Sequence, residues 1–153
     1  MNFQHPLNSK QPNVGTTIFA VMTGLANQHG AVNLAQGFPN VEVDPALISL
    51  VDKHSREGKN QYAPMPGLPI LKEKIAAKIE ELYGAKYHPI NEILITAGAT
   101  QAIYASVSAI VFPGDEVIVI EPAYDCYEPA IKLNGGVAVR TQLTQEFKVD
   151  WSD

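Results

Sequence analysis

Residues 93–141 read ILITAGATQAIYASVSAIVFPGDEVIVIEPAYDCYEPAIKLNGGVAVRT and decide the fold. Three short apolar runs, which we expect to be strands, alternate there with two longer segments that we expect to be helices. The expected strands are residues 93–96, 116–120 and 137–141, and the expected helices are residues 99–112 and 124–134. Proline and glycine residues separate these segments. The alternation predicts an α/β fold whose parallel sheet is covered on both faces.

Three further helices are expected upstream of this stretch. The first is capped at Thr16–Thr17 and ends at Gly30. The second begins with Asp44 as its cap and Pro45 at the first helical position. The third, residues 68–83, has apolar residues at steps of three and four, with lysine and glutamate on its other face. The polar opening before this helical part is linker-like.

The composition is that of an ordinary globular domain. Of the 153 residues, 46% are hydrophobic and 18% charged, which is too apolar for a disordered chain. The net charge of -5 argues against a nucleic-acid partner. A single cysteine, Cys126, excludes an intramolecular disulfide and indicates a reducing compartment. Neither a secretory signal nor an apolar run long enough to cross a bilayer is evident. We therefore expect a cytoplasmic protein with no membrane partner.

Metal binding is not expected, because the four histidines are dispersed and none pairs with another at ligand spacing. The best local signal is the turn at residues 96–101, where a strand ends and a helix begins. Backbone N–H groups at such a turn attract a phosphate, and Gly98 and Ala99 keep bulky side chains away. Most turns of this kind bind nothing, so this pattern alone leaves both interpretations open.

Two tyrosines give weaker signals. Tyr124 follows the second expected strand, at the edge where open α/β sheets bind ligands. There it could stack on a planar cofactor ring or serve as a core or interface tyrosine. Tyr62 lies on a proline-rich loop, residues 60–67, which alone would be only a turn.

Taken together, four segments resemble a known family. They are NLAQGFPN at 33–40, NQYAPMPGLPILKEKIA at 60–76, ITAGATQAIY at 95–104 and GDEVIVIEPAYDCYEPA at 114–130. In order and separation they resemble the N-terminal portion of the class I (fold-type I) pyridoxal-phosphate aminotransferases, most closely the methionine and kynurenine (aromatic) branch. The implied fold is an α/β PLP-transferase fold of type I, with a three-layer α/β/α large domain that is incomplete in this chain. Residues 1–44 would form an N-terminal arm and the start of the small domain, and residues 45–153 the first part of the cofactor-binding large domain.

The resemblance also implies a site for pyridoxal 5'-phosphate (PLP). Ala99 and Thr100 match positions whose backbone N–H groups hold the phosphate, and Gly98 makes the turn. Tyr124 matches the aromatic that stacks on the pyridine ring. Tyr62 matches a tyrosine that reaches the phosphate of the neighbouring subunit, which implies a homodimer with shared active sites.

For the substrates, the resemblance implies an amino acid and a 2-oxo acid. Gly37 matches a glycine whose backbone faces the substrate carboxylate, and Phe19 matches an aromatic of the side-chain pocket. The implied reaction moves an amino group from an apolar or aromatic amino acid, methionine-like, to the 2-oxo acid. A C–S lyase or synthase of the same fold shares these motifs, and a non-catalytic fragment or dimerisation module is a further alternative.

The sequence departs from the family pattern in one decisive respect. None of its nine lysines lies in a motif resembling that of the Schiff-base lysine. The aspartate for the pyridinium nitrogen and the arginine for the substrate carboxylate are also unmatched, so the chain alone is predicted to be inactive. By the same resemblance, strands of the unmatched half lie between residues 93–97 and 116–120. Both segments would then expose unpaired edges and apolar faces, so we expect the isolated chain to aggregate or to be held by a partner.

Overall fold

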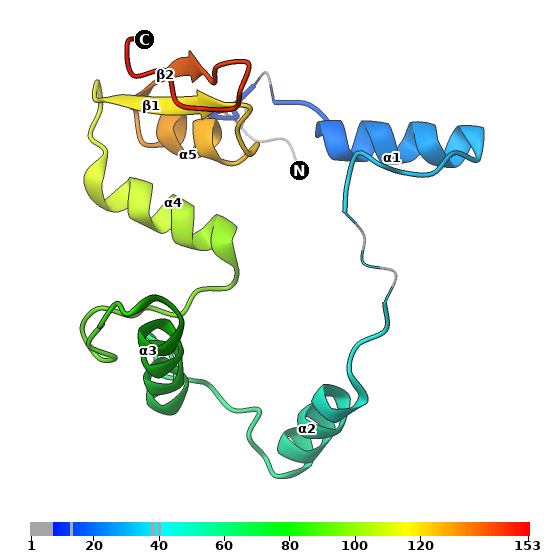
Figure 1. Cartoon of the computed structure of the whole chain (residues 1–153), viewed down its shortest axis with the longest axis vertical. Coiled ribbons are helices and arrows are strands. Elements are labelled where there is room, and N and C mark those ends of the chain that lie inside the picture. Colours follow the sequence, from blue (N-terminus) through cyan, green and yellow to red (C-terminus); the bar gives the residue numbers. More distant parts are fainter. Residues whose placement is uncertain (1–7, 13, 38, 40) are drawn as a thin grey trace, which may run out of the picture. The chain divides into compact units, whose positions relative to one another are not determined.

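The computed structural model describes residues 8–12, 14–37, 39 and 41–153. Two compact units make up the chain (Figure 1). The first unit combines residues 1–36 with residues 97–153, and the second is residues 37–96. The chain therefore leaves the first unit after its opening helix and returns to it just before the predicted phosphate turn.

A two-stranded parallel sheet organises the first unit. Strand β1 (Glu116–Glu121) pairs with β2 (Val137–Gln142), with Glu116 opposite Val137 and Glu121 opposite Gln142. Helix α5 (Tyr127–Leu133) connects the two strands. Parallel neighbours need such a crossover, because a tight hairpin cannot join them. The strand–helix–strand arrangement confirms the α/β prediction for this part of the chain.

The core of the first unit lies where α5 meets the sheet. Val119 of β1 is buried together with Ala130 and Ile131 of α5. Gly136 must stay small here, because an added Cβ would lie 2.7 Å from Val111 Cγ1 and 2.9 Å from Ile131 Cγ2. The glycine pair after α5 therefore allows β2 to start close against the helix.

Two more helices belong to the first unit. Helix α1 (Ile18–His29) begins at Thr17, whose hydroxyl accepts the Ala20 N–H at 3.3 Å, and ends at the left-handed Gly30, as predicted. Helix α4 (Ala99–Ile110) packs against α5. The opening segment is also attached, because the Gln11 side-chain amide donates to the Pro129 carbonyl at 3.1 Å.

The second unit contains helices α2 (Pro45–Arg56) and α3 (Pro69–Tyr83). The Asp44 carboxylate accepts the Ala46 N–H at 2.8 Å and caps α2, as its sequence predicts. Lys72 of α3 is only 4% exposed, and its ammonium group donates to the Ile90 carbonyl at 3.0 Å. This bond ties the segment after α3 back onto the helix.

Three sequence predictions need correction. Residues 93–96 form no strand: the Ile95 N–H donates to the Pro66 carbonyl at 3.2 Å, and no neighbouring strand pairs with the segment within the described residues. The helix predicted from residue 124 begins at Tyr127, because residues 124–127 form a turn with a 3.2 Å bond between its ends. The helix predicted to reach residue 112 ends at Ile110, because the Phe112 N–H is already bonded to the Asp115 carboxylate at 2.8 Å.

Apolar side chains remain exposed on the first unit. Ile118 of β1 is 70% exposed, and Phe112 is 69% exposed. The second edge of β1 has no partner strand in the described residues. The resemblance predicted both the exposed apolar face and the open edge of this strand, whereas the sheet covered on both faces that the alternation predicted is not found in the described residues. In the described part of the chain, no helix has the length and apolarity needed to cross a bilayer.

Candidate cofactor site

The predicted phosphate turn lies at the start of α4. Gly98 has φ 91° and ψ 166°, a conformation that only glycine adopts readily, and it directly precedes the helix. A Cβ built on Gly98 would have no atom within 4 Å, so the space at the turn is open. Gln101 Oε1 accepts the Ala97 N–H at 2.6 Å, which fixes the approach to the helix. This bond links the residue before the turn to the first turn of the helix.

The electrostatics of this helix start favour an anion. The first N–H groups of an α-helix have no acceptor within the helix, and the helix dipole places partial positive charge there. The first turn of α4 carries no acidic residue, and no side chain caps it. Helix α2 differs, because the Asp44 carboxylate already accepts an N–H at its start. Of these two helix starts, α4 is the one without a side-chain cap, which is compatible with the phosphate site predicted there.

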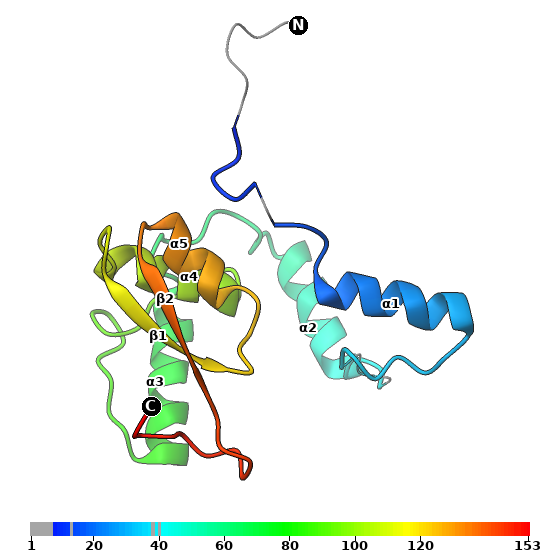
Figure 2. The ribbon, with the colours of Figure 1, turned by 90° about the horizontal axis from the view of Figure 1, so that it is seen from above.

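The direction of α4 brings this turn to the ligand edge of the sheet. Helix α4 runs opposite to β1, so its first residues and the last residues of β1 lie at the same end of the first unit (Figures 1 and 2). The segment after β1, residues 122–126, carries Tyr124. The topology therefore places two of the predicted site elements at one end of the unit, where open α/β sheets bind ligands.

The structure brings together two aromatic residues predicted separately. The rings of Phe19, from α1, and Tyr124 have centroids 6.3 Å apart and are tilted by 41°. Tyr127 meets Tyr124 edge-on at 6.1 Å, with an interplanar angle of 64°. Both geometries are favourable for aromatic pairs. The Tyr124 side chain nevertheless remains 51% exposed, which leaves surface for a flat ligand.

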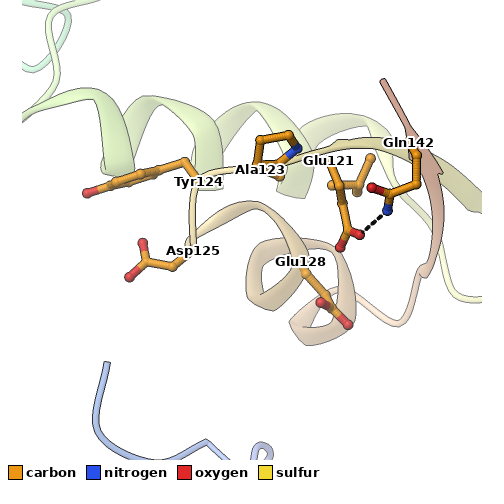
Figure 3. A pocket seen from close by; sticks show the side chains of 8 residues that line it. Glu121, Ala123, Tyr124, Asp125, Glu128 and Gln142 are labelled. Carbon is orange, nitrogen blue, oxygen red and sulfur yellow. Dashed lines mark hydrogen bonds between the residues drawn. The ribbon is translucent and has the colours of Figure 1, made fainter. Parts of the chain in front are cut away.

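A hollow of about 400 Å³ adjoins Tyr124 (Figure 3). Its lining comes from the end of β1, the following turn, α5 and the end of β2: Val119, Glu121, Pro122, Ala123, Tyr124, Asp125, Glu128 and Gln142. No lysine is among these described residues. The described part of the chain also contains no cluster of three or more histidine, cysteine, aspartate or glutamate residues suited to a metal ion.

The ion pairs of Glu128, which lines this hollow, were not predicted from the sequence. Glu128 receives the Lys132 ammonium group at 2.5 Å and the Arg140 guanidinium group at 2.5 Å. Hydrogen bonds from Lys132 and then Arg140 hold the pKa of Glu128 below its ordinary range. The pair of Glu128 with Lys132 could have been predicted, because residues four apart on a helix are neighbours on its surface. No pattern in the nearby sequence indicated the pair of Glu128 with Arg140.

Gly37 and Tyr62 belong to the second unit. The Tyr62 side chain is fully exposed there. Gly37 lies in an irregular segment and is also exposed. The roles that the resemblance gives to these two residues, a contact with a neighbouring subunit and one with the substrate carboxylate, remain predictions.

Comparison with known proteins identifies the family. A family described as "Aminotransferase class I and II" matches residues 29–153. This chain belongs to the class I and II aminotransferases. The methionine aminotransferase of Escherichia coli K12 is 49% identical over 146 residues, which cover 95% of this chain and 38% of that protein. Human kynurenine–oxoglutarate transaminase 1 is 38% identical over 122 residues, or 78% of this chain and 29% of its own length.

Solved aminotransferase structures confirm the fold. An E. coli structure identified with a methionine aminotransferase function has a TM-score of 0.90 and 48% identity, and the match covers 97% of this chain and 39% of that one. The N-succinyldiaminopimelate aminotransferase structure from Mycobacterium tuberculosis has a TM-score of 0.82 and 41% identity. The match covers 91% of this chain and 36% of that one. The structure is thus a partial α/β portion of the fold-type I aminotransferase fold. The chain spans less than two fifths of the length of these relatives.

Class I aminotransferases use PLP, and the site residues fit that group. The start of α4 offers backbone N–H groups without a competing carboxylate, which suits a phosphate dianion. Tyr124 offers a partly exposed aromatic ring at the same end of the unit, which suits a pyridine ring. These features lie on Gly98, Ala99, Thr100 and Tyr124, the residues that the resemblance predicts to hold the cofactor, and that role remains a prediction.

Proposed function

We propose that this chain supplies part of the active site of a PLP-dependent aminotransferase. The reaction would move an amino group from an apolar or aromatic amino acid, methionine-like, to a 2-oxo acid. The observation that carries the proposal is the contact of Phe19 with Tyr124 at 6.3 Å. It joins a substrate-pocket candidate to a cofactor-stacking candidate. The identity of 49% with the E. coli protein named methionine aminotransferase supports the same substrate class.

In this proposal the chain holds and orients the cofactor. The N–H groups of Ala99 and Thr100 would bind the phosphate, with Gly98 shaping the turn. Tyr124 would stack on the pyridine ring. PLP, when bound, supplies the electron sink that stabilises negative charge at the substrate α-carbon. Fixing both the phosphate and the ring leaves the cofactor little freedom to rotate, which favours reaction at one bond.

The substrate would be recognised by Phe19 and Gly37. The Phe19 ring offers an apolar surface beside Tyr124, and burial of a methionine-like side chain against aromatic rings is favourable. The backbone of Gly37 would face the substrate carboxylate. The same pocket admits the 2-oxo acid, because both substrates pass through one site in a two-stage reaction.

The proposal extends to assembly and location. Tyr62, fully exposed in the second unit, would reach the phosphate of a neighbouring subunit in a homodimer with shared active sites. We also propose a cytoplasmic protein, and a division into an arm with the start of the small domain, residues 1–44, and the first part of the large domain, residues 45–153.

Catalysis would need a lysine that these 153 residues do not supply, so the chain alone would be inactive. The test is an assay of the protein expressed from its own gene, with methionine, PLP and a 2-oxo acid. Amino transfer that depends on the 2-oxo acid supports the proposal. Release of ammonia instead would indicate the C–S lyase alternative. No turnover and no PLP binding would indicate a non-catalytic module.

A further inference from the structure

The turn that carries Tyr124 has an acidic residue at each end. Glu121 is the last residue of β1, and Glu128 lies in the first turn of α5. Residues 122–127 connect them. Two carboxylates that flank a short turn repel each other unless a cation lies between them. The shape of the turn therefore depends on what neutralises this pair.

Arg140 of β2 contacts both carboxylates. Its Nε lies 3.4 Å from Glu121 Oε1, and its Nη2 lies 2.5 Å from Glu128 Oε2. Both carboxylates are partly shielded, with side chains 31% and 27% exposed, whereas that of Arg140 is 55% exposed. A guanidinium group is planar and presents several N–H donors, so one arginine can bridge two acids in a fixed geometry.

Two neighbouring groups complete the arrangement. The Gln142 side-chain amide donates to Glu121 Oε2 at 2.6 Å, and Lys132 binds Glu128 Oε1 at 2.5 Å. Each contacts only one of the two acids, so neither joins the ends of the turn. The Arg140 guanidinium is charged at any ordinary pH, and hydrogen bonding to Glu128 raises its pKa further.

We propose that Arg140 is a positioning residue that fixes the turn carrying Tyr124, and through it the contact of Tyr124 with Phe19. The bridge joins the residue before this turn to the residue after it and anchors both to β2. Without it, the two acids would separate and the Tyr124 ring would lose its defined place. A role in catalysis follows only if the proposed function is correct, whereas the positioning of Tyr124 does not depend on it.

The test is fluorine NMR of the protein expressed from its gene and labelled with 3-fluorotyrosine. The Tyr124 signal is the one missing from Tyr124→Phe, and Phe19→Leu shows how far the neighbouring ring shifts it. Arg140→Met removes the bridge, whereas Lys132→Met is the matched control, because it removes a cation from Glu128 and leaves the bridge intact. Arg140→Lys keeps the charge and can contact only one acid well.

We expect Arg140→Met to move the Tyr124 signal in the direction of Phe19→Leu, while the Tyr83 signal stays in place. Arg140→Lys should give an intermediate shift, and it decides the question if the methionine variant fails to fold. Lys132→Met should leave the signal unchanged. An unmoved Tyr124 signal in both Arg140 variants, or an equal shift in Lys132→Met, would overturn the inference.

The affinity for PLP, measured on the same proteins, separates this inference from the proposed function. Loss of the bridge should weaken PLP binding about fivefold, the effect expected for two partly exposed ion pairs. Lys132→Met should change it less than twofold. If the wild-type protein binds no PLP, the proposed function fails, and the Tyr124 signal still decides the role of Arg140.

Discussion

Replacing Gly98 by alanine tests the phosphate turn directly. Gly98 has φ 91° and ψ 166°, and a side chain there costs about 1–3 kcal/mol in backbone strain. No atom lies within 4 Å of the added Cβ, so the backbone alone accounts for the cost. In the free protein the Gly98→Ala turn relaxes to a permitted conformation. PLP binding must then restore the strained conformation, and this cost should weaken the affinity about tenfold or more, because 1.4 kcal/mol corresponds to a factor of ten.

Gly114→Ala is the matched control for this prediction. Gly114 also has a positive φ, 90°, and its added Cβ would likewise meet no atom within 4 Å, but it lies in the turn before β1. Gly114→Ala should lower the unfolding midpoint and leave the affinity for PLP within twofold. The assay is equilibrium dialysis of PLP against the protein expressed from its gene. Wild-type affinity in Gly98→Ala, or equal losses in both variants, would refute the reasoning.

Three further predictions concern packing and charge. Gly67→Ala should destabilise the second unit by about 3 kcal/mol or more, because φ is 101° and the new Cβ would lie 2.2 Å from Ile95 Cγ1; thermal unfolding measures this. Lys72→Met should cost about 1–3 kcal/mol by leaving the Ile90 carbonyl without its donor, measured by chemical unfolding. Glu128→Gln should lower stability at neutral pH. Since the pKa of Glu128 is lowered in the folded state, this loss should be full above about pH 4.3 and shrink as the pH falls further.

Matched variants separate these effects from general damage. Gly58→Ala has a positive φ, 73°, with open space around its Cβ, so it should cost less than Gly67→Ala. Lys74→Met, on an exposed position of the same helix as Lys72, should change stability little. A pH-independent difference between Glu128→Gln and the wild type would contradict the third prediction, as would an effect of Lys74→Met equal to that of Lys72→Met.

The beginnings of α1 and α2 were predictable because their causes are local, whereas the end of α4 and the beginning of α5 were predicted two or three residues wrong. Thr17 and Asp44 accept N–H groups only a few residues away, and Gly30 and Gly84 end their helices by adopting a left-handed conformation. Where such a cap or a left-handed glycine is present, the sequence carries the signal for the helix end. The beginnings of α1 and α2 therefore agreed with expectation.

The strand predicted at residues 93–96 failed for a different reason. An apolar run shows that a segment is suited to burial, but a strand also needs a neighbouring chain to accept its hydrogen bonds. The Ile95 N–H is bonded to the Pro66 carbonyl instead. The pattern of apolar residues within the segment does not show whether a neighbouring strand is available to pair with it. The pattern alone therefore predicted a strand that does not form.

The site shows the same division. The turn at Gly98 and the place of Tyr124 after β1 followed from local patterns and topology. The contact of Phe19 with Tyr124 and the bridge from Arg140 to Glu121 and Glu128 join residues on different elements. Such contacts depend on how the elements pack, so the sequence could indicate the participants but not their geometry.

The most direct test of the central claim is the intact mass of the protein expressed from its gene, after incubation with PLP and reduction with borohydride. We expect the mass to rise by that of one phosphopyridoxyl group, and peptide mapping should place this group on a lysine other than the nine present here. No gain in mass, or a group attached to one of these nine lysines, would contradict the claim.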